Sequence, residues 1–359
     1  MNDTLQDMMR EATRLTQAGH LTEATDLIQR ALRASKTPTA APQHSSAASS
    51  FVIDGIVLNR SVDSGPVNAE VDGAGEFISG SQIHAGLTRR YKLYVPPRHT
   101  GRALPLVVML HGCTQDPDDF SAGTDMNARA REQGFFVLYP AQSQDGNAQR
   151  CWNWFARAHQ QRGSGEPALL ADMTQSVMRQ YGIDAQHVYI AGLSAGGAMA
   201  DIVAAAYPEI YAAVGVHSGL PRGAATNVAG AFAAMKNGEP TSRSTAKVSE
   251  TTVPTIVFHG DADQTVHPKN GEQVIAARLR DVDSNEPSVA QCVVSGDRSY
   301  TRSIYRTKGG ETLAEHWVVK GAGHAWSGGS AKGSYTDAKG PDATGEMLRF
   351  FFEHPLKQS

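Results

Sequence analysis

The sequence has few of the features that mark several large protein classes. Its 359 residues include only three cysteines, Cys113, Cys151 and Cys292, which are too few and too scattered for a disulfide scaffold or a zinc site. No apolar run approaches the length needed to span a membrane. A balance of 33 basic against 36 acidic residues gives a net charge of −3, which argues against a nucleic-acid partner. We therefore expect a globular protein with no metal site, no nucleic-acid partner and no transmembrane segment.

The first 50 residues differ in composition from the rest of the chain. Residues 1–34 have the pattern of two short amphipathic helices around Gly19, with the spacing of one helix-turn-helix repeat of the tetratricopeptide kind. One copy cannot bury its own apolar face, so we expect a hairpin that packs on the main body or on a partner chain. A dedicated targeting element is the alternative. Residues 35–50, rich in Ala, Ser, Thr, Pro and Gln, predict a flexible linker.

Residues 51–359 are predicted to form one α/β domain, because apolar runs alternate with amphipathic segments. Strands are expected at 90–95, 104–110, 135–139, 188–191, 212–217, 255–259 and 315–320, with an edge pair near 299–306. Helices are expected at 124–133, 167–181, 195–207, 271–281 and 344–354. Residues 221–250 are expected to be a structureless excursion, either a lid or a simple loop. The alternation predicts a mostly parallel, doubly wound sheet that binds ligands at the carboxyl ends of its strands.

The most informative stretch is Gly192-Leu193-Ser194-Ala195-Gly196. It lies between a strand-type run and a helix opened by small residues, which places Ser194 at a sharp strand-to-helix turn. Glycine on either side tolerates the crowded backbone, and the amide of Ala195 at the helix N-terminus faces any negative charge that develops there. A bare Gly-x-Ser-x-Gly also occurs by chance. The flanking strand and helix favour a catalytic nucleophile.

A nucleophilic serine needs a base and a carboxylate that orients the base. In folds with this turn, the acid and then the histidine follow the serine in the chain. His324 lies in a glycine-rich loop beyond the strand at 315–320, so it is the predicted base. The strand at 255–259 ends in two candidate acids, Asp261 and Asp263. Their spacing does not decide between them, since either could cap the turn.

Stabilisation of an oxyanion needs a second backbone donor from the loop Leu110-His111-Gly112-Cys113-Thr114-Gln115. Gly112 lets the backbone turn, so the amide of Cys113 is predicted to lie beside that of Ala195. In an alternative hypothesis Cys113 is itself the nucleophile of a cysteine hydrolase. That hypothesis leaves the turn at Ser194 without a role.

Five motifs follow one another along the chain. They are Leu110-His111-Gly112-Cys113-Thr114-Gln115, Cys151-Trp152-Asn153-Trp154, Gly192-Leu193-Ser194-Ala195-Gly196-Gly197, His259-Gly260-Asp261-Ala262-Asp263 and Gly323-His324-Ala325-Trp326. In this order they resemble the poly(3-hydroxybutyrate) depolymerase family of esterases, which are α/β-hydrolases related to feruloyl and acetylxylan esterases. The resemblance covers about residues 80–354. It implies a Ser–Asp–His triad whose acid is Asp263, without metal or organic cofactor.

The resemblance also implies a reaction and its surroundings. The expected reaction is hydrolysis of poly- or oligo(3-hydroxybutyrate) or related short polyesters, with a feruloyl- or acetylxylan-type esterase as the alternative. Relatives of this type imply a disulfide between Cys113 and Cys151, which would be hard to maintain in a reducing cytosol. Trp326, Trp152 and Gln115 are expected to contact substrate, with core packing as the alternative for the tryptophans.

Several differences from the secreted, polymer-degrading members shape the remaining expectations. The sequence shows no signal peptide, fibronectin-like linker or C-terminal substrate-binding module, so soluble oligomers, amorphous polymer or small esters are expected rather than crystalline polymer. A cytoplasmic location follows, with an extracellular one as the alternative. A peptidase on the same scaffold is the rival within enzymes. A different class is an adaptor that uses residues 1–34 for self-association or for contact with polyester granules.

Overall fold

The computed structural model describes residues 50–53, 56–59, 73–97, 101–238, 253–280, 287–293 and 298–357. The predicted hairpin at 1–34 lies outside the described residues, as does the predicted linker except for Ser50, which begins the first strand. Both stay predictions. None of the described helices combines the length and the apolar composition that crossing a membrane requires.

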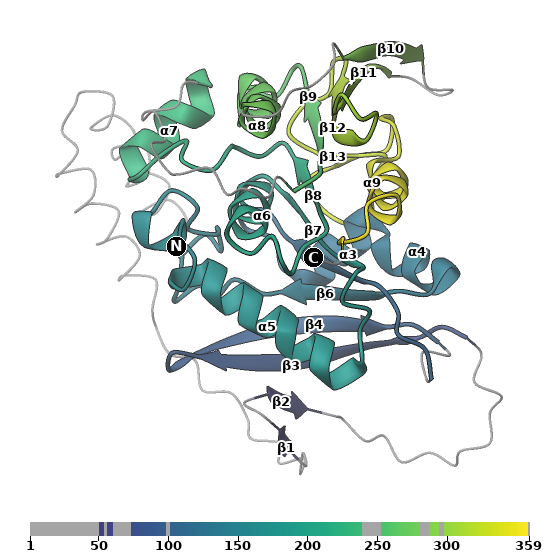
Figure 1. The fold of residues 1–359 in the computed structure, drawn as a ribbon. Coiled ribbons are helices and arrows are strands. Elements are labelled where there is room, and N and C mark those ends of the chain that lie inside the picture. Colours follow the sequence, from purple (N-terminus) through teal and green to yellow (C-terminus); the bar gives the residue numbers. More distant parts are fainter. Residues whose placement is uncertain are drawn as a thin grey trace. The chain divides into compact units, whose positions relative to one another are not determined.

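The described part of the chain is built around a 12-stranded sheet in the order β1-β2-β3-β4-β6-β5-β7-β8-β9-β12-β11-β10 (Figure 1). The strands are β1 (Ser50–Ile53), β2 (Ile56–Asn59), β3 (Glu76–His84), β4 (Leu87–Val95), β5 (Leu106–Leu110), β6 (Phe136–Pro140), β7 (Val188–Leu193), β8 (Ala213–His217), β9 (Thr255–Gly260), β10 (Ser288–Val293), β11 (Ser299–Arg306) and β12 (Thr312–Val319). The six strands from β6 to β12 along this order are parallel, and antiparallel strands extend the sheet at both ends. The predicted fold class is confirmed.

Helices cover both faces of the sheet (Figure 1). They are α3 (Pro117–Thr124), α4 (Met126–Gln133), α5 (Gly165–Tyr181), α6 (Ala195–Ala206), α7 (Val228–Asn237), α8 (Lys269–Leu279) and α9 (Ala343–Phe352), with a short 3₁₀ turn at Arg157–His159. Alternate residues of a central strand enter different cores: Leu106 packs with residues of α5 and α6, and Val107 packs with residues of α9. Because both faces are covered, these strands read as continuous apolar runs.

The structure differs from the sequence-based expectation around Asp116. Residues 117–123 were expected to precede the helix at 124–133, but they belong to α3, which Pro117 opens. Asp116 caps this helix by accepting a hydrogen bond from the amide of Asp119 at 3.0 Å. Asp125 then adopts a left-handed conformation, with φ of 54°, and separates α3 from α4. The capping pattern of Asp116 and Pro117 was the local signal for this helix.

The excursion at 221–250 is not structureless throughout. Residues Val228–Asn237 form α7, capped by Asn227, whose side chain accepts a hydrogen bond from the amide of Gly230 at 2.8 Å. Only Ala231 and Ala234 of this helix are buried. So narrow and small an apolar face gives a weak periodic signal, which explains why the helix was missed. Residues 239–252 of the excursion lie outside the described part of the chain.

Candidate active site

Ser194 lies at the turn between β7 and α6 in a strained conformation, with φ of 58° and ψ of −119°. Its amide donates to the carbonyl oxygen of His217 at 2.8 Å, and its own carbonyl accepts from the amide of Ala198 at 2.9 Å. A side chain on Gly196 would collide with the backbone carbonyl of Leu110. The flanking glycine is therefore required for the helix to approach β5 and for the serine to occupy this turn.

His324 and Asp263 form a hydrogen-bonded pair. Nδ1 of His324 donates to Oδ2 of Asp263 at 2.7 Å, and the other oxygen of Asp263 accepts from the amides of Thr265 and Val266, each at 2.9 Å. Burial acts to raise the pKa of Asp263, but hydrogen bonds from His259 and His324 outweigh it and hold this pKa well below the usual range for aspartate. Asp263 is thus a buried carboxylate that fixes the orientation of the His324 ring.

Asp261, the other candidate acid, has a different role. Its carboxylate accepts from the amide of Gly321 at 2.6 Å and pairs with Lys320 at 3.3 Å. These contacts hold the start of the loop that leads to His324. Spacing alone left Asp261 and Asp263 open, and the family resemblance implied Asp263, which is the residue that lies against the histidine in the structure.

His217, the last residue of β8, is a further residue of the site that no sequence motif indicated. Its ring is stacked between Phe258 and Trp326, with centroid distances of 5.8 and 5.0 Å, and its Nε2 accepts from the amide of Ser327 at 2.9 Å. Burial, with the charges of His259 and His324, lowers the pKa of His217 to about 3, so the ring is neutral. His217 therefore joins the turn of Ser194, through its carbonyl, to the loop of His324, through its ring.

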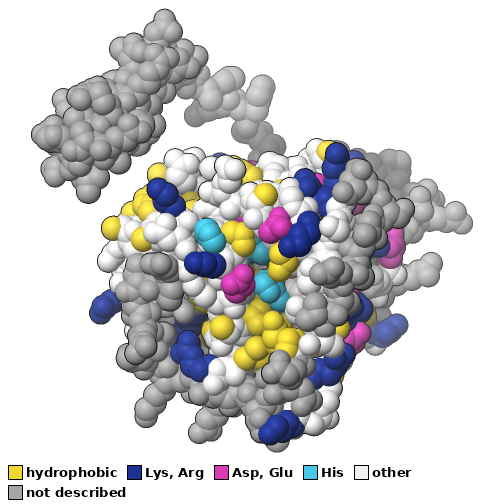
Figure 2. Space-filling model, turned by 90° about the horizontal axis from the view of Figure 1, so that it is seen from above, with side chains coloured by type: hydrophobic (Ala, Val, Ile, Leu, Met, Phe, Trp, Pro, Cys, Tyr) yellow, Lys and Arg dark blue, Asp and Glu magenta, His cyan; other side chains and the backbone are white. Residues whose placement is uncertain are grey.

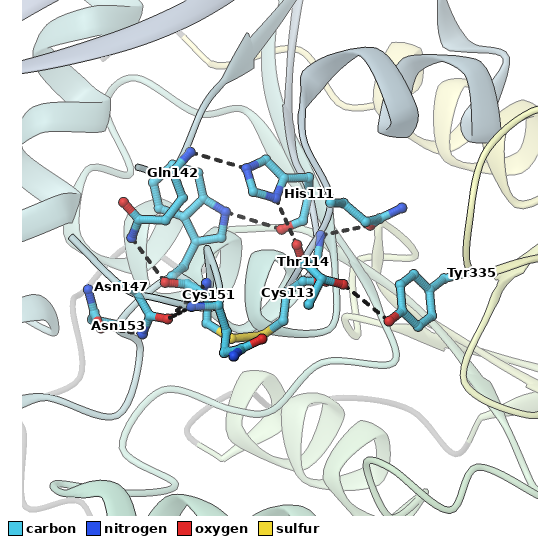
Figure 3. The surroundings of a disulfide bond; sticks show 12 residues. His111, Cys113, Thr114, Gln142, Asn147, Cys151, Asn153 and Tyr335 are labelled. Carbon is cyan, nitrogen blue, oxygen red and sulfur yellow. Dashed lines mark hydrogen bonds between the residues drawn. A yellow bond between two sulfur atoms is a disulfide. The ribbon is translucent and has the colours of Figure 1, made fainter. Parts of the chain in front are cut away.

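The loop after β5 is held from several sides (Figure 3). The amide of Gly112 donates to Oε1 of Gln115 at 3.0 Å, and Nδ1 of His111 donates to the carbonyl of Gly112 at 2.7 Å. The His111 ring accepts from the amide of Gln142 at 3.1 Å, and burial lowers its pKa to about 4. Among the described residues, no acceptor is found for the amide of Cys113. This amide is therefore available to a ligand.

Cys113 and Cys151 form a disulfide (Figure 3). The segment around Cys151 is held by Gln142, whose Nε2 donates to the carbonyl of Cys151 at 3.0 Å. Thr114 follows Cys113 in the loop after β5, residues 110–115, which we call the oxyanion loop. Its amide donates to the carbonyl of Gln149 at 2.7 Å. The disulfide and these bonds together tie the loop after β5 to the segment after β6.

Ala195 is the first residue of α6, so its amide has no partner within the helix. It belongs to the same turn as Ser194, the residue before the helix. The amides of Ala195 and Cys113 belong to the ends of neighbouring parallel strands, since β5 pairs with β7 in the sheet. The predicted pair of donors thus comes from one edge of the sheet.

The predicted substrate contacts are corrected by the structure. Trp326 is 1 % exposed, packs edge-on against Phe120 and donates its indole N–H to Thr344 at 3.0 Å. Trp152 is fully buried and donates to the carbonyl of His111 at 3.1 Å. Both rings form core under the loops rather than a wall open to substrate, which was the alternative for the tryptophans.

Gln115 is also buried rather than facing substrate. Besides accepting from Gly112, it donates from Nε2 to Asp119 at 2.9 Å and to the carbonyl of Ser334 at 3.2 Å. Burial acts to raise the pKa of Asp119, but hydrogen bonds from Ser334 and Gln115 outweigh it and lower this pKa. Gln115 thereby braces the oxyanion loop against the loop that follows Trp326.

Figure 2 shows a face of the molecule on which side chains of several kinds are mixed. In Figure 2, histidine side chains lie among hydrophobic ones, with basic and acidic side chains interspersed on the described part of this face. Within the described ranges, no cluster of three or more His, Cys, Asp or Glu side chains is arranged to hold a metal ion.

The arrangement defines a class of protein. A serine at a strained strand-to-helix turn, with an aspartate and a histidine beyond neighbouring strands of a doubly wound sheet, is the architecture of an α/β-hydrolase. An acetyl xylan esterase from Aspergillus awamori has the same fold: it is 19% identical, with a TM-score of 0.57, over 74% of this chain and 94% of that one.

The sequence comparisons show the family. Residues 89–294, more than half of the chain, match the esterase PHB depolymerase family, and the chain belongs to it. A poly(3-hydroxyalkanoate) depolymerase C of Paucimonas lemoignei is 31% identical over 61% of this chain and 54% of its own length. An acetylxylan esterase A of Talaromyces purpureogenus is 27% identical over 59% of this chain and 56% of its own length. The chain thus spans about half the length of these curated relatives.

Proposed function

We propose that this protein is a serine esterase that cleaves carboxylic ester bonds with Ser194, His324 and Asp263. The observation that carries the proposal is the 2.7 Å bond from His324 to the buried carboxylate of Asp263, at the sheet edge where β7 ends in the strained turn of Ser194. Ser194 follows β7, Asp263 follows β9 and His324 follows β12. These three strands run parallel, so their carboxyl ends lie at one edge of the sheet. Family membership supports the same reaction.

In the proposed mechanism, His324 removes the proton of Ser194 as the serine oxygen attacks the ester carbonyl. Because Nδ1 of His324 donates to Asp263, Nε2 is the nitrogen left to accept this proton. His324 then protonates the departing alcohol, and water attacks the acyl-enzyme in a second, equivalent cycle. The buried carboxylate stabilises the imidazolium that forms in each half-reaction.

The amides of Cys113 and Ala195 are the proposed oxyanion donors. Each such donor contributes about 3 kcal/mol to transition-state stabilisation. The hydrogen bonds of His111 and Gln115 and the disulfide support this role, because they fix the backbone of the donor loop before substrate binds. Preorganised donors need no reorientation during the reaction.

We further propose oligomers or amorphous chains of 3-hydroxybutyrate, or related short polyesters, as substrates. The similarity to the depolymerase of Paucimonas lemoignei supports this choice. The similarity to the acetylxylan esterase of Talaromyces purpureogenus supports a second candidate, the hydrolysis of acetyl or feruloyl esters of carbohydrates.

A rate panel tests both candidates, with Ser194→Ala as the blank. It includes p-nitrophenyl esters from acetate to octanoate, methyl ferulate, the dimer and trimer of hydroxybutyrate, and the amorphous polymer. Preference for the hydroxybutyrate oligomers is the expected result. Preference for ferulate or acetyl esters would select the second candidate, and rates equal to the blank on every ester would refute the proposed function.

The disulfide bears on the compartment. Disulfides persist in oxidising environments and are rare in the cytosol. The bond between Cys113 and Cys151 supports an oxidising compartment over the cytoplasmic location expected from the sequence. Alkylation of free thiols in intact cells before lysis tests this proposal, since a bridged pair resists labelling.

A further inference from the structure

An exposed aromatic side chain joins the two loops that carry the proposed oxyanion donor and the proposed base. The hydroxyl of Tyr335 lies 3.2 Å from Oγ1 of Thr114, the neighbour of Cys113 (Figure 3). The carbonyl oxygen of Tyr335 accepts from the amide of Trp326 at 2.7 Å, two residues beyond His324. Tyr335 is therefore fixed at the border of the site from two directions.

Both partners of this contact have unusual backbones. Tyr335 has φ of 51° and Thr114 has φ of 67°, in the left-handed region that bulky and β-branched residues rarely adopt. Such conformations cost about 1–3 kcal/mol each and persist only where the surroundings impose them. The surroundings do so here, because Asp119 accepts from the amide of Ser334 at 2.8 Å and Gln149 accepts from the amide of Thr114.

Burial separates Tyr335 from the other aromatic side chains of these loops. Tyr335 is 47% exposed, whereas Trp326 and Trp152 are at most 1% exposed. A ring that is rigidly held and open to solvent offers a large contact area at a low entropic cost. Packing of the core does not require it, so its position points to a ligand.

We propose that Tyr335 determines the substrate specificity of this site: its ring contacts the organic group of the ester beyond the scissile carbonyl, and its bond to Thr114 holds the ring beside the oxyanion loop. The inference rests on the proposed esterase function. It assigns to Tyr335 the aromatic contact with substrate that was expected from the sequence for Trp326. Tyr335 takes no part in bond cleavage, so its removal changes the size preference of the enzyme rather than its chemistry.

The test measures kcat and KM for p-nitrophenyl acetate and octanoate with the full chain. In Tyr335→Ala, the ratio of kcat/KM for octanoate to that for acetate is expected to fall about tenfold, mainly through KM for octanoate. Tyr335→Gly is the second variant, because glycine adopts the positive φ of this position without strain, and the same fall in the ratio is expected for it. It replaces the alanine variant if that variant folds poorly. Ile83→Ala, which truncates an exposed residue of β3, is the control and should leave the ratio unchanged.

Two conservative variants test the bond to Thr114. Tyr335→Phe and Thr114→Val each remove the hydrogen bond and keep the ring, so each is expected to lower the ratio by no more than about threefold. The double variant should lose nothing beyond Thr114→Val, because Thr114→Val already breaks the bond to Tyr335, together with the bond from the Thr114 hydroxyl to the carbonyl of Cys113 at 2.6 Å.

An unchanged ratio in both Tyr335→Ala and Tyr335→Gly, or equal losses on both esters, would overturn the inference and leave the esterase function intact. Wild-type rates no higher than those of Ser194→Ala would overturn the proposed function and the inference together.

Discussion

Removing the disulfide should destabilise the protein and slow catalysis at the same time. Cys113 and Cys151 are separated by 38 residues, and cross-linking a loop of that length stabilises the folded state by about 4 kcal/mol in the chain-entropy description. Cys113→Ala/Cys151→Ala is therefore expected to lower the free energy of unfolding by about this amount. Urea unfolding followed by circular dichroism measures the difference.

The same variant tests the support of the oxyanion loop. Alanine at position 113 keeps the backbone amide, so any loss of rate reports its positioning rather than its removal. Since one misplaced donor is worth about 3 kcal/mol at most, kcat is expected to fall by about 10- to 100-fold. The thiol count of the unfolded wild type without reductant should be one, because two of the three cysteines are bridged.

Reductant supplies the matched control. Wild type and Cys292→Ala should both lose stability in dithiothreitol, and the double variant should not respond to it. Three free thiols in the wild type, or a double variant within about 1 kcal/mol of it in unfolding free energy, would show that the disulfide reasoning is wrong.

Three further predictions concern the acid, the buried histidines and the core. Asp263→Asn should lower kcat by about 10³- to 10⁴-fold and Asp261→Asn by less than about threefold, because only Asp263 orients His324. Steady-state kinetics measures both effects, and the reverse result would identify Asp261 as the acid. In the folded state the pKa of His217 is about 3 and that of His111 about 4, both below the unfolded value near 6.5. The unfolded chain therefore binds more protons, and stability is lost as the pH falls from about 6.5 towards 4, by about 2 kcal/mol for each histidine at pH 5. An unfolding free energy that stays constant over this pH range would contradict the prediction. Trp326→Ala removes a buried core side chain and should lower the free energy of unfolding by about 3–5 kcal/mol, measured by urea unfolding. Wild-type stability together with an altered ester preference would show that Trp326 contacts substrate instead.

The fold class and the positions of the proposed triad along the chain could be predicted from the amino-acid sequence alone. Continuous apolar runs alternating with helical segments predict a covered parallel sheet, and the structure confirms it. Ser194, Asp263 and His324 each follow the end of a strand, and glycines such as Gly192 within β7 and Gly323 mark these positions locally. Such signals are readable because they depend on neighbours within a few residues.

Which side chains meet, and which are buried, could be seen only in the three-dimensional structure. Asp261 and Asp263 are equivalent by spacing, and they differ because Gly321 and His324 approach from another strand. Trp326, in its glycine-rich loop, was expected to contact substrate, yet it is buried against residues distant in sequence, Phe120 among them. Burial and pairing depend on contacts between segments that lie far apart in the chain, and local patterns carry no information about those contacts.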